Sequence, residues 1–254
     1  MLLWQSENMP SQLNEFFTPA GIHVLSTPSS DLIPVVFLGG ICWTAETARN
    51  ELLRYRPHQA IAFSYRGHGQ SAFREGLGIH ELKKDLLEVV ETMALQKFCL
   101  VAYSFSVPVA ILFSRAHSDL LKMLVLMDYP AESRERPLSW VSEVQAALPT
   151  MDIRTIEGLQ QDITQQEFWK DLQGLPFPVL LLHGTQEDSR IAPVHLQKYH
   201  QHVDRLLVEK MEGSGHNLWQ PDPEAPSRKV LQHLHNIMRP EQSGEFSVPF
   251  PDDA

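Results

Sequence analysis

The segment FCLVAYSFSVPVA, residues 98–110, switches from one kind of secondary structure to another around a single serine. It opens with a continuous apolar run, which is typical of a strand that is buried on both faces of a sheet. Pro108 lies where the first turn of a helix would follow, and a proline is tolerated there because its missing N–H group is not needed. The segment therefore predicts a buried strand, a sharp turn at Ser104, and a helix directly after the turn.

Other apolar runs alternate with helical patterns along most of the chain. Buried strands are expected at residues 34–38, 60–63, 98–102, 123–127 and 178–182, with a weaker one at 205–208. Another helix is expected over residues 222–238, and between the strands apolar residues recur at helical spacing, at Ile79, Leu82, Leu86, Val90 and Met93. This alternation is the pattern of an α/β protein with a mostly parallel central sheet flanked by helices.

Residues 129–175 depart from the alternation, because they contain short helical patterns and no strand signal. We interpret them as a small helical lid insertion in a single domain that spans residues 1–254, with helices near 140–148, 155–163 and 165–172. Its arginines are interpreted as solvated surface, with contact to an anionic substrate as the alternative; they are Arg134, Arg136 and Arg154. The polar residues 241–254 are expected to form a flexible C-terminal tail.

Composition excludes several classes of function. The net charge is −10 and no stripe of Lys and Arg is present, so no nucleic-acid partner is expected, since such binding depends mainly on neutralised phosphates. No apolar run is long enough to predict a membrane span, and the first residues, MLLWQSENMP, lack the features of a signal peptide, so a cytoplasmic protein is expected. Cys42 and Cys99 lie in or beside apolar runs and are expected to be reduced thiols.

The turn at Ser104 is the kind of position that a nucleophilic serine requires, between the end of a buried strand and the start of a helix. Small residues are needed two places before and two places after it, where the two backbones come close. Glycine is usual at both places, and here they hold Ala102 and Ser106. A serine that caps a helix is the alternative interpretation of this motif alone.

Four further segments resemble the α/β-hydrolase superfamily, in the right order and across residues 32–238. They are VVFLGGI at 35–41, YRGHGQS at 65–71, PVLLLHGTQEDSRIAP at 178–193 and EGSGHN at 212–217. The resemblance implies a small-molecule acyl substrate and neither a metal nor an organic cofactor. A partly apolar substrate is suggested by residues of the insertion that could wall an apolar pocket, although they are more plainly the insertion's own core: Trp140, Leu148, Ile153, Phe168 and Trp169. The second segment, with His68, is interpreted as a structural loop.

The resemblance also assigns roles to single residues. Ser104 would be the nucleophile and His216 its general base, in the chain order serine, acid, histidine that this fold uses. Asp188 is the preferred acid that holds the histidine tautomer. Glu187, favoured by spacing from the preceding strand, and Asp128, at the end of the strand at 123–127, are the alternatives.

Acyl transfer also needs donors for the charge that develops on the carbonyl oxygen. The resemblance places this oxyanion hole at the backbone amides of Ile41 and Phe105. A serine hydrolase that cleaves an ester, thioester or lactone through an acyl-enzyme is then expected. Two alternatives stay open: a lyase or other non-hydrolytic reaction, suggested by Tyr103 beside the nucleophile, and a catalytically silent relative that binds a ligand or partner.

Overall fold

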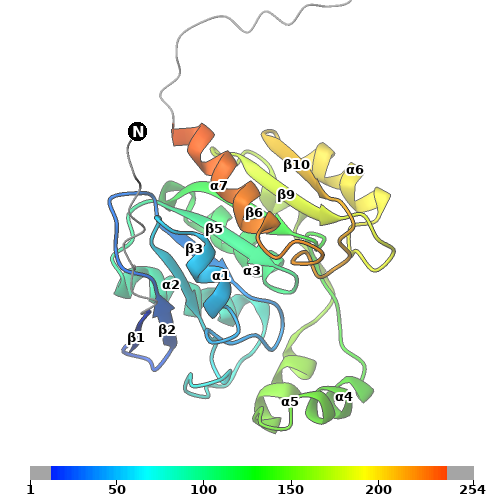
Figure 1. Ribbon diagram of the computed structural model, residues 1–254. Coiled ribbons are helices and arrows are strands. Elements are labelled where there is room, and N and C mark those ends of the chain that lie inside the picture. Colours follow the sequence, from blue (N-terminus) through cyan, green and yellow to red (C-terminus); the bar gives the residue numbers. More distant parts are fainter. Residues whose placement is uncertain (1–12, 239–254) are drawn as a thin grey trace, which may run out of the picture.

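A central sheet of eight strands runs through the computed structural model, which describes residues 13–238 (Figure 1). The strand order is β1-β2-β4-β3-β5-β6-β9-β10, and only the pairs β1·β2 and β2·β4 are antiparallel in this sheet. The bounds are β1 (Asn14–Phe17), β2 (His23–Ser26), β3 (Val35–Leu38), β4 (Ala60–Phe63), β5 (Phe98–Tyr103), β6 (Leu121–Met127), β9 (Val179–Gly184) and β10 (Leu206–Met211). The expected mostly parallel sheet is confirmed.

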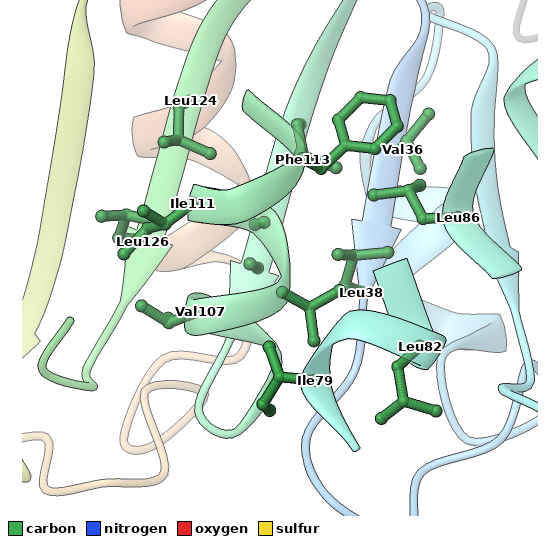
Figure 2. Packing of buried hydrophobic residues seen from close by; sticks show 14 of the residues in the cluster. Val36, Leu38, Ile79, Leu82, Leu86, Val107, Ile111, Phe113, Leu124 and Leu126 are labelled. Carbon is green, nitrogen blue, oxygen red and sulfur yellow. The ribbon is translucent and has the colours of Figure 1, made fainter. Parts of the chain in front are cut away.

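Helices cover both faces of this sheet because alternate side chains of each strand are buried on opposite sides. In β3, Val36 and Leu38 belong to one apolar cluster, and Val35 and Phe37 belong to the other. The first cluster includes residues of α2 (Ile79–Thr92), α3 (Ser106–Ala116) and α6 (Pro193–His202); the second includes residues of α1 (Arg49–Arg54) and α7 (Ala225–Met238). Figure 2 shows side chains of α2 and α3 packed against those of β3 and β6.

Parallel strands bring several loops to one edge of the sheet. The strands β3, β5, β6, β9 and β10 all run in the same direction, so the loops that follow their carboxyl ends lie along a common edge. Ligands of open α/β sheets bind at that edge. The sequence motifs that suggest chemistry follow four of these strands, β3, β5, β9 and β10, and the alternative acid Asp128 follows the fifth.

The insertion between β6 and β9 contains two helices, α4 (Ser139–Ala147) and α5 (Ile153–Asp162), which pack on each other and stand out from one end of the sheet (Figure 1). The expectation of no strand was wrong, because β7 (Glu132–Ser133) and β8 (Gln166–Glu167) form a small antiparallel pair. Strands of two residues are too short to produce an alternating pattern. The third expected helix is reduced to the short 3₁₀ turn η2 (Trp169–Leu172). That this insertion acts as a lid on a single domain stays a prediction.

The loop after β4 is tied to α2 by a buried ion pair. The Arg66 guanidinium donates to both carboxylate oxygens of Asp85, with Nη2 at 2.7 Å from Oδ1, and the Arg66 amide donates to Oδ2 at 2.9 Å. His68 is buried, with its Nδ1 3.0 Å from the Arg66 carbonyl oxygen, and burial lowers its pKa. These contacts agree with the interpretation of this loop as structural.

Other differences from the sequence prediction are local. The elements β1, β2, α1 and α6 are additional to those predicted, as is the 3₁₀ turn η1 (Ser118–Leu120). The helix α7 begins at Ala225, because the Asp222 side chain forms a turn with the Glu224 amide. Both cysteines are unpaired. Within residues 13–238 every helix is too short or too polar to cross a membrane. The predictions for the first ten residues and for residues 241–254 lie outside the described part of the chain.

Candidate active site

Ser104 lies at the sharp turn between β5 and α3, as the sequence predicts. Its φ of +55° is in the left-handed region that non-glycine residues rarely adopt. Such a backbone conformation costs roughly 1 kcal/mol or more, and residues that adopt it cluster at functional sites. Hydrogen bonds hold the turn: the Ser104 amide donates to the Met127 carbonyl at 3.0 Å, and the Val107 amide donates to the Ser104 carbonyl at 2.9 Å. The backbone of the turn is therefore fixed by β6 and by the first turn of α3.

His216, from the loop after β10, faces this serine. Its Nε2 lies 2.9 Å from the Ser104 Oγ, within hydrogen-bonding distance. The backbone beside His216 lies against Gly184, because a Cβ at residue 184 would come within 2.3 Å of the Gly215 carbonyl oxygen. A glycine at residue 184 lets the loop pass close to the end of β9 and present the imidazole to Ser104.

Asp128 completes the hydrogen-bonded chain from the other side of the imidazole. Its Oδ2 lies 2.8 Å from the Nδ1 of His216, and the carboxylate is fully buried. Three further donors hold it: the Gly184 amide at 3.0 Å, the Ser189 hydroxyl at 2.6 Å and the Arg190 amide at 2.9 Å. Hydrogen bonds therefore connect the three side chains in the order Ser104, His216, Asp128.

The charge state of Asp128 follows from these contacts. Burial on its own would raise the pKa of this carboxyl group. The hydrogen bonds from His216, Ser189 and the amides of Arg190 and Gly184 favour the ionised form and outweigh burial, so the pKa lies below its usual value. Asp128 is thus a carboxylate at neutral pH, and it favours the histidine tautomer with the proton on Nδ1, which leaves Nε2 able to accept the serine proton.

This geometry favours the alternative acid Asp128 over the preferred acid of the sequence prediction. Asp188 and Glu187 are both exposed in the loop after β9, and it is Asp128, the rival candidate, that contacts His216 Nδ1. The Asp188 carboxylate instead lies against the Gly215 backbone. The loop after β9 still serves the acid, because its Ser189 and Arg190 donate to Asp128. The sequence held one signal for Asp128, an aspartate directly after a buried strand.

The loop after β3 brings Ile41 to the same pocket as Ser104. Among residues 13–238, the amides of Ile41 and Phe105 donate to no other group of the protein, and Phe105 begins α3. Ser106 fixes this loop to the turn at Ser104, since its buried hydroxyl donates to the Gly39 carbonyl and accepts from the Tyr65 hydroxyl at 3.1 Å. The serine that replaces the usual glycine therefore links the two proposed oxyanion segments, a role that the motif did not reveal.

Ser104 and His216 open into a pocket of about 460 Å³ between the sheet edge and the insertion. Ile41, Tyr129 and Trp140 give it apolar walls. Cys42 lines a separate cavity, and burial raises the pKa of its thiol to about 11, although the Arg136 charge acts in the opposite direction. A thiol with that pKa is protonated at neutral pH, so Cys42 is a poor nucleophile.

Tyr103, which suggested a non-hydrolytic reaction, is turned away from this pocket. It is buried, and its hydroxyl donates to the His216 carbonyl at 3.0 Å. Its ring packs among the aromatic rings of Trp43, Trp219 and His216. Its position is that of a support for the histidine loop.

Comparison with known proteins identifies the fold. No protein-family model and no curated protein matches the sequence. In structure, an enol-lactonase from Burkholderia xenovorans matches with a TM-score of 0.75 at 14% identity, over 87% of this chain and all (100%) of that chain. A carboxylesterase from Bacillus subtilis matches with a TM-score of 0.71 at 14% identity, over 90% of this chain and 93% of that chain. The chain has the α/β-hydrolase fold.

The α/β-hydrolase fold by itself does not fix the reaction. A loop variant of a haloalkane dehalogenase from Bradyrhizobium elkanii also matches, with a TM-score of 0.71 at 16% identity, over 89% of this chain and 97% of that chain. At these identities the likeness establishes the fold alone. The reaction of this chain therefore depends on the residues of its own site.

Proposed function

We propose that this protein is a serine hydrolase that cleaves a carboxylic ester, thioester or lactone through an acyl-enzyme on Ser104. One observation carries the proposal: the Ser104 Oγ lies 2.9 Å from His216 Nε2, and the other imidazole nitrogen lies 2.8 Å from Asp128. A nucleophile, a base and a group that orients the base are the three elements that this chemistry needs. The lactonase and the carboxylesterase of the same fold support it.

The first half of the reaction forms the acyl-enzyme. His216 Nε2 accepts the Ser104 proton while Oγ attacks the carbonyl carbon, and the Asp128 carboxylate stabilises the imidazolium. The Ile41 and Phe105 amides are the proposed donors to the resulting oxyanion. When the intermediate collapses, His216 returns the proton to the leaving oxygen or sulfur, and the alcohol or thiol departs.

The second half releases the acid. A water molecule gives a proton to His216 and attacks the acyl carbon, and the Ser104 oxygen leaves and recovers its proton. The proposed role of α4 and α5 is that of a lid, which covers the pocket and limits the size of the acyl group. The apolar walls of the pocket favour a partly apolar small molecule.

The test is hydrolysis of 4-nitrophenyl acetate and butyrate together with labelling by a fluorophosphonate probe. Wild type should cleave the esters and be labelled at Ser104, and Ser104→Ala should lose both while its circular dichroism spectrum is unchanged. Ser118→Ala, in the 3₁₀ turn η1 that follows α3, is the matched control and should behave as wild type. If wild type neither cleaves these esters nor is labelled, the protein is not a serine hydrolase, and the ligand-binding alternative gains support.

A further inference from the structure

The pocket at Ser104 is strongly basic in a protein that is acidic overall. Arg134, Arg136 and Arg190 all line it, and the residues that line it include no aspartate or glutamate in the described part of the chain. The chain as a whole carries 31 acidic residues against 21 Lys and Arg. The pocket around the proposed nucleophile therefore carries three positive charges, although the net charge of the protein is −10.

Two of these guanidinium groups are not neutralised by the protein. Within residues 13–238, neither Arg136 nor Arg190 has a carboxylate oxygen within 4.0 Å of its guanidinium. Arg134 has a distant ion pair, 3.6 Å from a Glu132 oxygen, and Glu132 is shared with Lys198. Most other arginines of the described chain donate to carboxylates or carbonyl oxygens. The pocket thus holds positive charge that an anion can use.

Both guanidinium groups belong to residues whose backbone is held by a hydrogen bond. The Arg190 amide donates to Asp128 at 2.9 Å, so this residue is anchored at the carboxylate beside His216. The Arg136 carbonyl accepts from the Gln160 side chain of α5 at 3.0 Å, and its guanidinium carbon lies 5.9 Å from the Trp140 ring centre. The Arg136 Nε is buried and has no hydrogen-bond partner in the described chain.

We infer that the substrate of this site carries an anionic group, a carboxylate or a phosphate, that Arg136 and Arg190 bind while the scissile carbonyl lies at Ser104. The inference rests on the proposed function and adds the substrate class to it. Guanidinium groups bind both kinds of oxyanion through paired N–H donors, and such charge-assisted bonds are the stronger ones. Of the three arginines in the insertion, Arg134 and Arg136 are therefore placed to contact an anionic substrate. Arg154 is paired with Asp152 and lines the separate cavity that contains Cys42.

A pair of esters that differ only in charge tests the inference. Mono-4-nitrophenyl adipate carries a free carboxylate, and methyl 4-nitrophenyl adipate has the same chain without the charge. Wild type should favour the anionic ester by about tenfold or more in kcat/KM, as expected for one charge-assisted contact. Arg136→Gln and Arg190→Gln should each reduce that ratio by about tenfold, because each variant removes such a contact.

Arg115→Gln is the matched control, because Arg115 is exposed on α3 outside the pocket and donates to the Gln173 carbonyl. This variant should keep the wild-type ratio between the two esters. Equal cleavage of both esters by wild type would overturn the inference and leave the serine hydrolase in place. The same holds if Arg136→Gln and Arg190→Gln preserve the ratio.

A binding measurement separates this inference from the proposed function. Calorimetry on Ser104→Ala should show tighter binding of the anionic ester than of its methyl-capped partner, whether or not wild type turns either over. Hexanoate and pentyl phosphate, tested as competitors for this binding, distinguish a carboxylate from a phosphate as the preferred group. If neither competes and the two esters bind equally, the pocket does not recognise an anion.

Discussion

The side chain of Tyr103 holds His216 in two ways at once. Its hydroxyl donates to the His216 carbonyl oxygen at 3.0 Å, and its ring stacks on the imidazole with 5.1 Å between ring centres and 26° between planes. Tyr103 directly precedes Ser104 at the end of β5. The strand β5 therefore leads directly to the proposed nucleophile, Ser104, and also carries the residue that supports its proposed base, His216. This shared strand helps to fix the distance between Ser104 and His216.

Removing only the hydroxyl separates these two contacts. Tyr103→Phe keeps the stacked ring and loses one hydrogen bond, which is worth about 1 kcal/mol, so kcat should fall roughly fivefold. KM should change little, because Tyr103 does not line the pocket. Tyr103→Leu removes the stacking as well and should lower kcat further. Steady-state kinetics with 4-nitrophenyl butyrate decides between the outcomes, and an unchanged kcat in both variants would show that this support is not needed.

The sheet could be predicted from the sequence because its strands are buried on both faces. Runs such as residues 60–63 have to be apolar throughout, and the strand found there, β4, has the same bounds. Elements that lack such a requirement were missed, and so was the buried strand β2, whose sequence HVLS is not a continuous apolar run. The edge strand β1 is largely exposed, and the small pair β7·β8 has only two residues in each strand.

The candidate site could be predicted only in part. Ser104 and His216 lie in local motifs that can be recognised from the sequence alone. The partner of His216 is set by how the ends of β6, β9 and β10 meet in space, and several carboxylates in the chain follow a strand closely enough to compete. In the loop after β9, spacing favoured Glu187, and residue type together with the following residues 189–193 favoured Asp188. The buried donors that gather around Asp128 appear only in the fold.

Replacement of each acid by its amide distinguishes Asp128 from Asp188. Asp128→Asn leaves the size of the side chain unchanged but removes the charge that favours the required histidine tautomer. A fall of about 10³- to 10⁴-fold in kcat is expected, by analogy with the same change in a serine protease triad. Asp188→Asn is the matched control, because Asp188 is exposed and lies against Gly215, and its kcat should stay within about threefold of wild type, as for most surface substitutions. The opposite order of effects would restore Asp188 as the acid.

Two buried serines of α3 offer a matched test of the link between Gly39 and the turn at Ser104. Ser106→Ala leaves the Gly39 carbonyl without its donor, which should lower the free energy of unfolding by about 1–3 kcal/mol and also lower kcat. Ser114 is buried as fully, but its hydroxyl has no hydrogen-bond partner in the described chain. Ser114→Ala should therefore be neutral or stabilising in urea unfolding. Equal losses in the two variants would mean that the hydroxyl of Ser106 contributes only by its volume.

The buried carboxyl group of Glu51 should make the protein less stable as the pH rises. Glu51 is a buried residue of α1, and burial raises the pKa of its carboxyl group although hydrogen bonds from Trp219 and Arg54 oppose the shift. A raised pKa in the folded state gives stability that is complete below the unfolded value of 4.5 and is lost as the pH rises toward the folded value. Glu51→Gln has no such titration. Wild type should therefore lose stability relative to Glu51→Gln as the pH rises from 4 to neutrality, by at most about 1.4 kcal/mol per pH unit, until the folded carboxyl ionises.

Glu209 provides the control of opposite sign in the same measurement. Hydrogen bonds from Lys229, and then from His233, lower the pKa of its carboxyl group, with burial acting against them. A lowered pKa gives stability that is present above the unfolded value and is lost as the pH falls through the folded value. Wild type should thus gain stability relative to Glu209→Gln as the pH rises to about 4.5, which is below the range in which it loses stability relative to Glu51→Gln. Urea unfolding of the three proteins between about pH 3 and 7 measures both differences. A wild type that keeps or gains stability relative to Glu51→Gln above pH 4.5 would show that burial does not dominate at Glu51.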